Sequence, residues 1–148
     1  MYRRYSPSAV DEAGLVSLGV LYLVCTECAR RNHFMTVGEI GCCGAYCGTC
    51  KVFLEHLCKG CKLGYENGER DISKAKCKMK VCCVSKKYQS CADCGDYGTC
   101  SILNEFYGKN GYKYRKYKEA TEYIRSNGYD AFLEVADTWK NAYGNYDR

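Results

Sequence analysis

The chain has 148 residues, with 14 cysteines, 15 glycines and 15 tyrosines but one proline and one tryptophan. This length suits a single domain. The formal net charge is +5, but two zinc ions, each held by four thiolates, would bring it to about +1. Net charge therefore gives little support to a nucleic-acid partner. Large aliphatic residues are scarce in the middle of the chain, so that part needs metals or disulfides to stay folded.

Residues 1–34 differ in composition from the rest, and we interpret them as an N-terminal extension of uncertain order. The apolar run from Gly14 to Cys25 is about a dozen residues, too short to cross a bilayer. It lacks the basic flank and the cleavage site of a signal peptide. The sequence thus predicts no membrane segment and a cytoplasmic location. Cys25 and Cys28 form an isolated pair, whose role the sequence leaves open.

Ten cysteines between residues 43 and 100 have the spacing of metal ligands. Three of their steps leave two residues between cysteines, a spacing that turns both sulfur atoms to one side of a tight loop. Tetrahedral zinc sites are usually built from two such pairs. The candidate ligands are Cys43, Cys47, Cys50, Cys58, Cys61, Cys77, Cys82, Cys91, Cys94 and Cys100.

Disulfides are the alternative for so many cysteines. Closely spaced pairs chelate metals well but rarely form structural disulfides with each other. Six lysines between residues 74 and 87 surround Cys77, Cys82 and Cys83, where they would compensate thiolate charge. These observations favour metal binding and a reducing compartment.

The ten candidate ligands suffice for two zinc sites. One division joins Cys47, Cys50, Cys58 and Cys61 in the first site and Cys77, Cys82, Cys91 and Cys94 in the second. Cys43 and Cys100 could then belong to either, and interleaved pairings fit the spacing equally well. The roles of Cys42 and Cys83 are left open, although we expect Cys83 to be a bystander. An iron–sulfur cluster is the alternative to zinc, because four thiolates suit both.

The second half of the chain predicts helices. One should begin at Thr99 or Cys100 and end at Gly108, and another should span about 112–126. A last helix should run from Asp130 to about Tyr143. A short helix over 51–57 should connect two ligand pairs. We therefore expect a small metal-stabilised domain over 35–148, mainly α-helical, with irregular zinc-knuckle loops in 35–103 and an antiparallel helical hairpin in 104–148.

The cysteine pattern resembles an uncharacterised prokaryotic family, catalogued as domain of unknown function 3795. That family opens with Cys-Gly-x-x-Cys-x-x-Cys, which Cys43 to Cys50 matches, and continues with the steps Cys58–Cys61, Cys77–Cys82 and Cys91–Cys94 and then Cys100. The resemblance covers about residues 36–140. The family often has proline where this chain has Thr99. The resemblance implies zinc binding and no established activity.

No phosphate-binding loop or Ser-His-Asp set is recognisable, which argues against an enzyme. Three functions fit the pattern. The first is a zinc-binding protein whose structural four-cysteine sites support a protein-interaction or adaptor module. The second is a nucleic-acid binder that uses Lys74–Lys87 and the tyrosines. The third is an iron–sulfur redox protein or subunit. Sequence alone leaves the partner, any substrate and the oligomeric state open.

Overall fold

The computed structural model describes residues 36–144. The chain divides into two units, Met1–Asn32 and His33–Arg148, and the described residues all belong to the second. The predictions for residues 1–34, including the pair Cys25 and Cys28, lie outside the described part.

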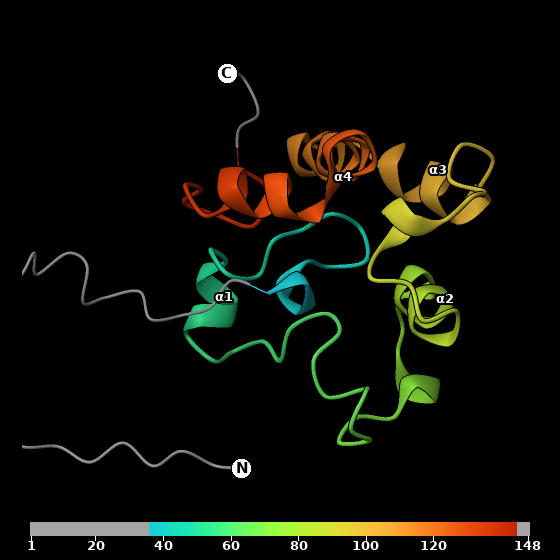
Figure 1. Ribbon diagram of the computed structural model, residues 1–148. Coiled ribbons are helices and arrows are strands. Elements are labelled where there is room, and N and C mark those ends of the chain that lie inside the picture. The colour runs from blue at the N-terminus through green and yellow to red at the C-terminus, as the bar shows by residue number, and fades with distance from the viewer. Residues whose placement is uncertain (1–35, 145–148) are drawn as a thin grey trace, which may run out of the picture. The chain divides into compact units, whose positions relative to one another are not determined.

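The described part is helical and contains no strand (Figure 1). Its α-helices are α1 (Lys51–Leu54), α2 (Lys78–Ser85), α3 (Ser101–Tyr107) and α4 (Tyr112–Ala136). Short 3₁₀ turns η2 (Val37–Glu39), η3 (Ile72–Lys74) and η4 (Cys91–Asp93) punctuate the intervening segments. The prediction of a mainly helical chain with irregular cysteine loops is confirmed at this level.

Helix α4 is bent where the sequence predicts a break. Gly128 has φ 86° and ψ 172° inside it, a conformation open to glycine because it has no Cβ. Figure 1 views the part before this bend nearly along its axis and the part after it from the side. Two helical parts therefore meet at Gly128, as predicted, and the second ends at Ala136 rather than near Tyr143.

Two other helices differ from expectation. The predicted helix over 51–57 is only the single turn α1. Val52 within it and Leu57 beyond it are exposed by 50% and 76%. Helix α2 is not predicted by the sequence reading. It buries Met79 and Cys83, which are four residues apart and therefore share one face of the helix.

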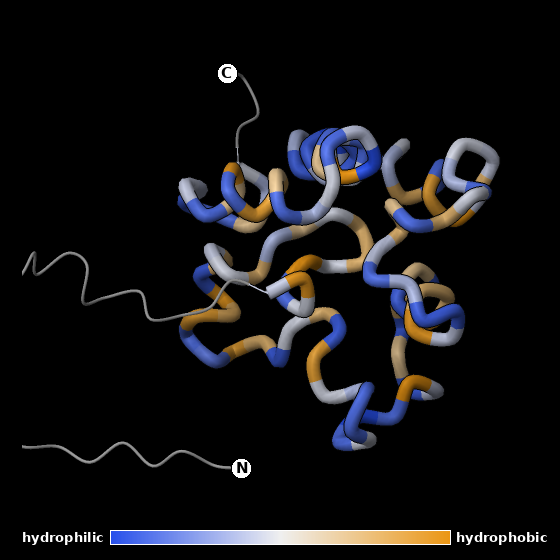
Figure 2. Tube along the Cα trace, in the orientation of Figure 1, coloured by the Kyte–Doolittle hydropathy of each residue, from blue (hydrophilic) through white to orange (hydrophobic). Residues whose placement is uncertain are grey.

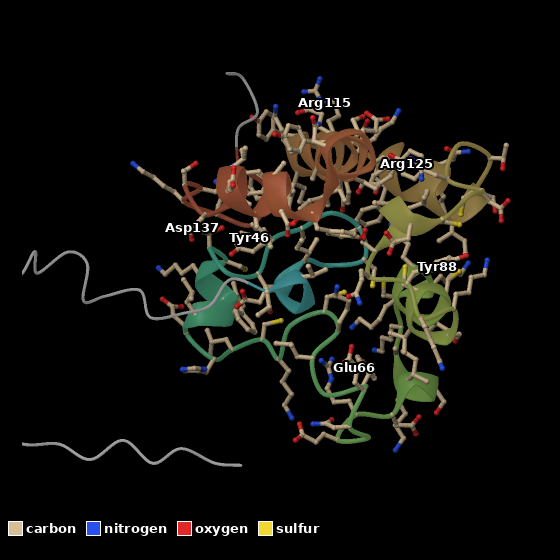
Figure 3. All side chains as sticks on the ribbon, viewed as in Figure 1. Tyr46, Glu66, Tyr88, Arg115, Arg125 and Asp137 are labelled. Carbon is tan, nitrogen blue, oxygen red and sulfur yellow. The ribbon has the colours of Figure 1, made fainter. Side chains whose placement is uncertain are left out.

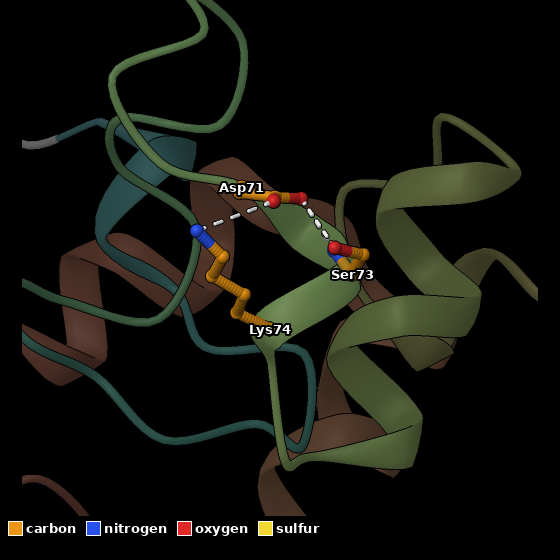
Figure 4. Close-up of polar contacts among 3 residues, drawn as sticks. All are labelled: Asp71, Ser73 and Lys74. Atoms are coloured by element: carbon orange, nitrogen blue, oxygen red, sulfur yellow. Dashed lines mark hydrogen bonds and ion pairs between the residues drawn. The ribbon is translucent and has the colours of Figure 1, made fainter.

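The loop before α2 ends in a capped turn. The Asp71 carboxylate accepts hydrogen bonds from the Ser73 backbone N–H and hydroxyl, at 2.9 and 2.7 Å (Figure 4). Lys74 Nζ lies 3.8 Å from the same carboxyl group. The hydrogen bonds from Ser73 lower the pKa of Asp71. This cap fixes the start of η3 and leads the chain into Cys77.

An apolar core joins α4 to the loop that follows η2. Tyr46 and Phe132 are almost fully buried, and Trp139 is 8% exposed. The centroid of the Phe132 ring lies 6.3 Å from that of the Tyr46 ring and 5.5 Å from that of the Trp139 ring, in edge-to-face geometry. Such pairs add about 0.5–1.5 kcal/mol beyond the area they bury. This core contains no candidate ligand, although its member Ala92 directly follows Cys91.

Gly44 lets the first cysteine loop approach α4. It has φ 91°, and a Cβ built there would lie 2.5 Å from the Tyr117 carbonyl oxygen and 2.6 Å from Thr121 Oγ1. We expect Gly44→Ala to lower the free energy of unfolding by about 2–4 kcal/mol, because strain and overpacking both oppose it. Denaturant unfolding measures this loss. Gly95→Ala is the matched control, since no atom lies within 4 Å of its added Cβ. Equal stability of the two variants would contradict the prediction.

Candidate metal centre

The thiols gather around a second core, beside the apolar one. Its buried members are Cys42, Met79, Cys83, Cys91 and Leu103, and several half-buried cysteines pack against them. Figure 3 shows sulfur atoms beside α2, near the labelled Tyr88. All of the cysteines in residues 36–144 are free thiols, so no disulfide occurs in this part of the chain.

Four of these cysteines form two pairs in contact. The Sγ atoms of Cys42 and Cys61 are 3.8 Å apart, and those of Cys83 and Cys91 are 3.5 Å apart. The pairs belong to one core, in which Cys42, Cys83 and Cys91 are buried and Cys61 is half-buried. The Cys91 backbone N–H also donates to the Cys42 carbonyl at 3.0 Å. We call Cys42, Cys61, Cys83 and Cys91 the central thiol cluster.

The Sγ separations match those around zinc. With Zn–S bonds of about 2.3 Å, two sulfur atoms of a tetrahedral site lie about 3.8 Å apart. Each pair therefore has the length of one edge of a zinc tetrahedron. In residues 36–144, however, no group of three or more His, Cys, Asp or Glu side chains is already placed around a common metal position. The thiols present have the right chemistry and pairwise spacing, but they are not assembled into a finished site.

Two members of the central thiol cluster were not among the sequence-predicted ligands. Cys42 is 1% exposed and Cys83 is 2% exposed, and each belongs to a Cys-Cys doublet. Spacing treats one cysteine of each doublet as redundant. The β-bridge between Ile40 and Tyr46 instead closes a loop around Cys42. Cys83 lies on the buried face of α2. The sequence signal that could have identified Cys83 as buried is its spacing of four residues from Met79, which places both on one face of a helix.

The first predicted group is partly brought together. Cys50 and Cys58 act electrostatically on Cys47, and the Cys61 backbone N–H lowers the pKa of Cys47. Burial outweighs this contact and raises the pKa of Cys47 to about 11. Cys58 is exposed. Cys61 lies between this group and Cys42, so it belongs to both neighbourhoods.

The second predicted group is divided. Cys82, Cys91 and Cys94 line one small cavity between α2, η4 and α3, together with Cys83 and Cys100. Cys77, which the sequence assigns to this group, is not part of the lining and instead acts electrostatically on Cys43. Lys86 stands near Cys82 and Cys94, and this proximity raises the pKa of its ammonium group.

The metal-free thiols resist ionisation. Burial raises the pKa of Cys43 to about 12, against a hydrogen bond from the Ala45 backbone. The hydrogen bond with Cys61 lowers the pKa of Cys42, but contact with Cys83 and burial outweigh it and raise that pKa to about 12. The hydrogen bond with Cys42 and burial also raise the pKa of Cys61. A metal ion would have to displace these protons.

Helices α3 and α4 hold the first doublet in place. The Cys43 carbonyl accepts hydrogen bonds from the Tyr107 hydroxyl and from Thr121 Oγ1, both at 3.2 Å. The hydroxyl oxygens of Tyr107 and Thr121 also form a hydrogen bond with each other, at 2.9 Å. The loop that carries Cys42 and Cys43 is therefore positioned by residues far along the chain.

Arg125 of α4 holds the second ligand loop (labelled in Figure 3). Its guanidinium donates to the carbonyls of Ala92 and Cys94, at 2.6 and 2.9 Å, and lies 4.8 Å from the centre of the Tyr97 ring. Tyr129 reinforces this contact with hydrogen bonds of 2.9 Å to both Ser90 and Asp93.

We expect Arg125→Ala to lower the free energy of unfolding by about 1–2 kcal/mol. Two charge-assisted hydrogen bonds are lost, and exposure of the side chain limits the effect. Denaturant unfolding in excess zinc checks the value. Arg115→Ala, an exposed arginine of the same helix, is the control. A loss at residue 115 as large as that at residue 125 would contradict the role given to Arg125.

Comparison with known proteins adds no relative. No family model, no curated protein and no solved structure matches this chain. The resemblance described above therefore stays a prediction. In the described part, no helix has the length and apolar character needed to cross a membrane.

Proposed function

We propose that the chain is a cytoplasmic zinc-binding protein whose structural four-cysteine sites support a protein-interaction module. The observation that carries this proposal is the contact between free thiols at 3.5 and 3.8 Å, the edge length of a zinc–thiolate tetrahedron. A closed four-thiolate site leaves no position for substrate, so the zinc would be structural. The metal would then supply the folding free energy that the sparse aliphatic residues around the thiols do not.

The interaction module is supported by exposed aliphatic side chains. Val52, Leu54, Leu57 and Leu63 are exposed by 50, 57, 76 and 39%. They lie in α1 and the loop after it, where Figure 2 shows hydrophobic positions in orange. Apolar side chains gathered at a surface are typical of contact sites for proteins. We expect Leu57→Glu to abolish binding of a partner that the wild-type chain recovers, without changing the zinc content.

An iron–sulfur protein is the second candidate, favoured by the five cysteines that line the cavity between α2 and α3. The cavity has a volume of about 20 Å³, and its lining includes the contacting pair Cys83 and Cys91, so a cluster would have to widen it. The tyrosines give less support to a nucleic-acid binder. Tyr114 and Tyr117 pack on Phe106, and Tyr143 packs on Tyr117, with ring centroids 5.2, 6.2 and 6.0 Å apart.

Metal analysis of protein purified without oxygen tests these proposals. We expect a colourless protein that contains zinc and lacks iron and acid-labile sulfide. A brown, iron-containing protein would replace the first proposal with the second. Protein that carries neither metal, and that binds no zinc when zinc is added under reducing conditions, would overturn both.

A further inference from the structure

Lys62 carries a buried charge beside the central thiol cluster. The side chain is 8% exposed, and its ammonium group donates to the carbonyls of Val37 and Gln89 at 2.8 and 2.6 Å. Two neutral carbonyls do not supply a counter-charge, and a buried ammonium without one is costly.

The groups that face Lys62 identify where its counter-charge belongs. Cys61 adjoins Lys62 in the chain, and Cys42, Cys83 and Asp93 lie near its ammonium group. The Asp93 carboxylate is already bound by the backbone N–H groups of Gln89 and Ser90 and by the Tyr129 hydroxyl. Neutral thiols would leave the ammonium uncompensated, whereas metal-bound thiolates would compensate it.

We propose that Cys42, Cys61, Cys83 and Cys91 together bind one zinc ion as four thiolates, with Lys62 as the counter-charge of that site. The Cys42–Cys61 and Cys83–Cys91 pairs supply opposite edges of the tetrahedron and move together onto the ion. Zinc displaces the four thiol protons, which pass to water, and the site carries a net charge of about −2. Lys62 halves that charge and ties the site to the carbonyls of two loops.

This proposal rests on the proposed zinc binding and deepens it. It takes one ligand from each predicted group, Cys61 and Cys91, and adds the two cysteines that spacing set aside. Eight free cysteines then remain among the described residues, enough for two further sites: Cys43, Cys47, Cys50, Cys58, Cys77, Cys82, Cys94 and Cys100.

The test counts zinc in the full chain and in the variants Cys42→Ser and Cys83→Ser. We expect each folded variant to bind one zinc fewer than the wild-type protein. Variants that keep the full zinc content would overturn the four-cysteine assignment while leaving the proposed function intact. Wild-type protein without zinc would overturn the proposed function itself.

Lys62→Met tests the counter-charge and covers the case in which the serine variants do not fold. Cobalt(II) replaces zinc, and its sulfur-to-metal absorption reports the charge around the thiolates. We expect this absorption band to move to longer wavelength in Lys62→Met. We also expect the metal affinity, measured by competition with a chelator, to fall about 10–100-fold, as for other losses of a group that supports metal ligands. Lys59→Met, in the same loop but exposed, should leave both unchanged. An unshifted band and unchanged affinity in Lys62→Met would contradict the proposal.

Discussion

Removal of zinc by a chelator should unfold residues 36–144. A structural zinc site contributes on the order of 10 kcal/mol to folding, which is comparable to the whole stability of a typical domain. The core around the thiols has only Met79 and Leu103 as buried side chains other than cysteine, so little else would hold it. We expect the helical circular dichroism to fall as the chelator takes the metal, together with a change in the fluorescence of Trp139.

Addition of zinc under reducing conditions should restore both signals, and addition of magnesium should not, because magnesium prefers oxygen ligands. Helical signal that persists after the chain has lost all its zinc would contradict the expectation. It would show that the apolar core alone keeps the chain folded.

Phe132→Ala should destabilise the chain by about 3–5 kcal/mol without changing its zinc content. Phe132 is fully buried and packs edge-to-face between Tyr46 and Trp139. The substitution removes these contacts and leaves a cavity. Because this core contains none of the candidate ligands, the thiols should remain able to bind metal. Denaturant unfolding in excess zinc gives the loss of stability, and metal analysis of the folded variant gives the zinc content.

Phe132→Leu is the matched control, since it keeps most of the apolar volume and should cost much less. A loss of zinc in folded Phe132→Ala would contradict this expectation and show that the apolar core also supports the thiols. Equal stability of the two variants would argue that the site relaxes around the missing ring.

Local signals in the sequence predicted the later helices well. Gly108 and Gly128 end or bend helices where expected, because such backbone positions depend on one or two residues. The extent of α1 and the existence of α2 were not predicted. A single turn such as α1 is too short to show a clear periodicity. Helix α2 buries Met79 and Cys83 together, but the sequence analysis treated the cysteines of this segment only as metal ligands and so did not count them toward an apolar helix face.

The sequence located the cysteine region but did not assign the thiols to sites. Spacing identifies pairs that are close along the chain, such as Cys58 and Cys61. The contacts in the structure join residues that are distant in sequence or belong to doublets, such as Cys42 with Cys61 and Cys83 with Cys91. Which cysteine of a doublet turns inward depends on Gly44, on α2 and on the hydrogen bonds to Cys43, none of which is a property of spacing.

The last described residues hold the first cysteine loop. The Tyr46 backbone N–H donates to the Ala142 carbonyl at 2.9 Å, and the Thr49 hydroxyl donates to the Asn141 carbonyl at 2.8 Å. These partners are about a hundred residues apart, so the contacts form only after Asn141 and Ala142 have left the ribosome. During synthesis, Cys47 and Cys50 would emerge earlier, in a loop that these hydrogen bonds do not yet hold. A cell making this protein would then have to protect those sulfur atoms from oxidation until residues 141 and 142 have been added.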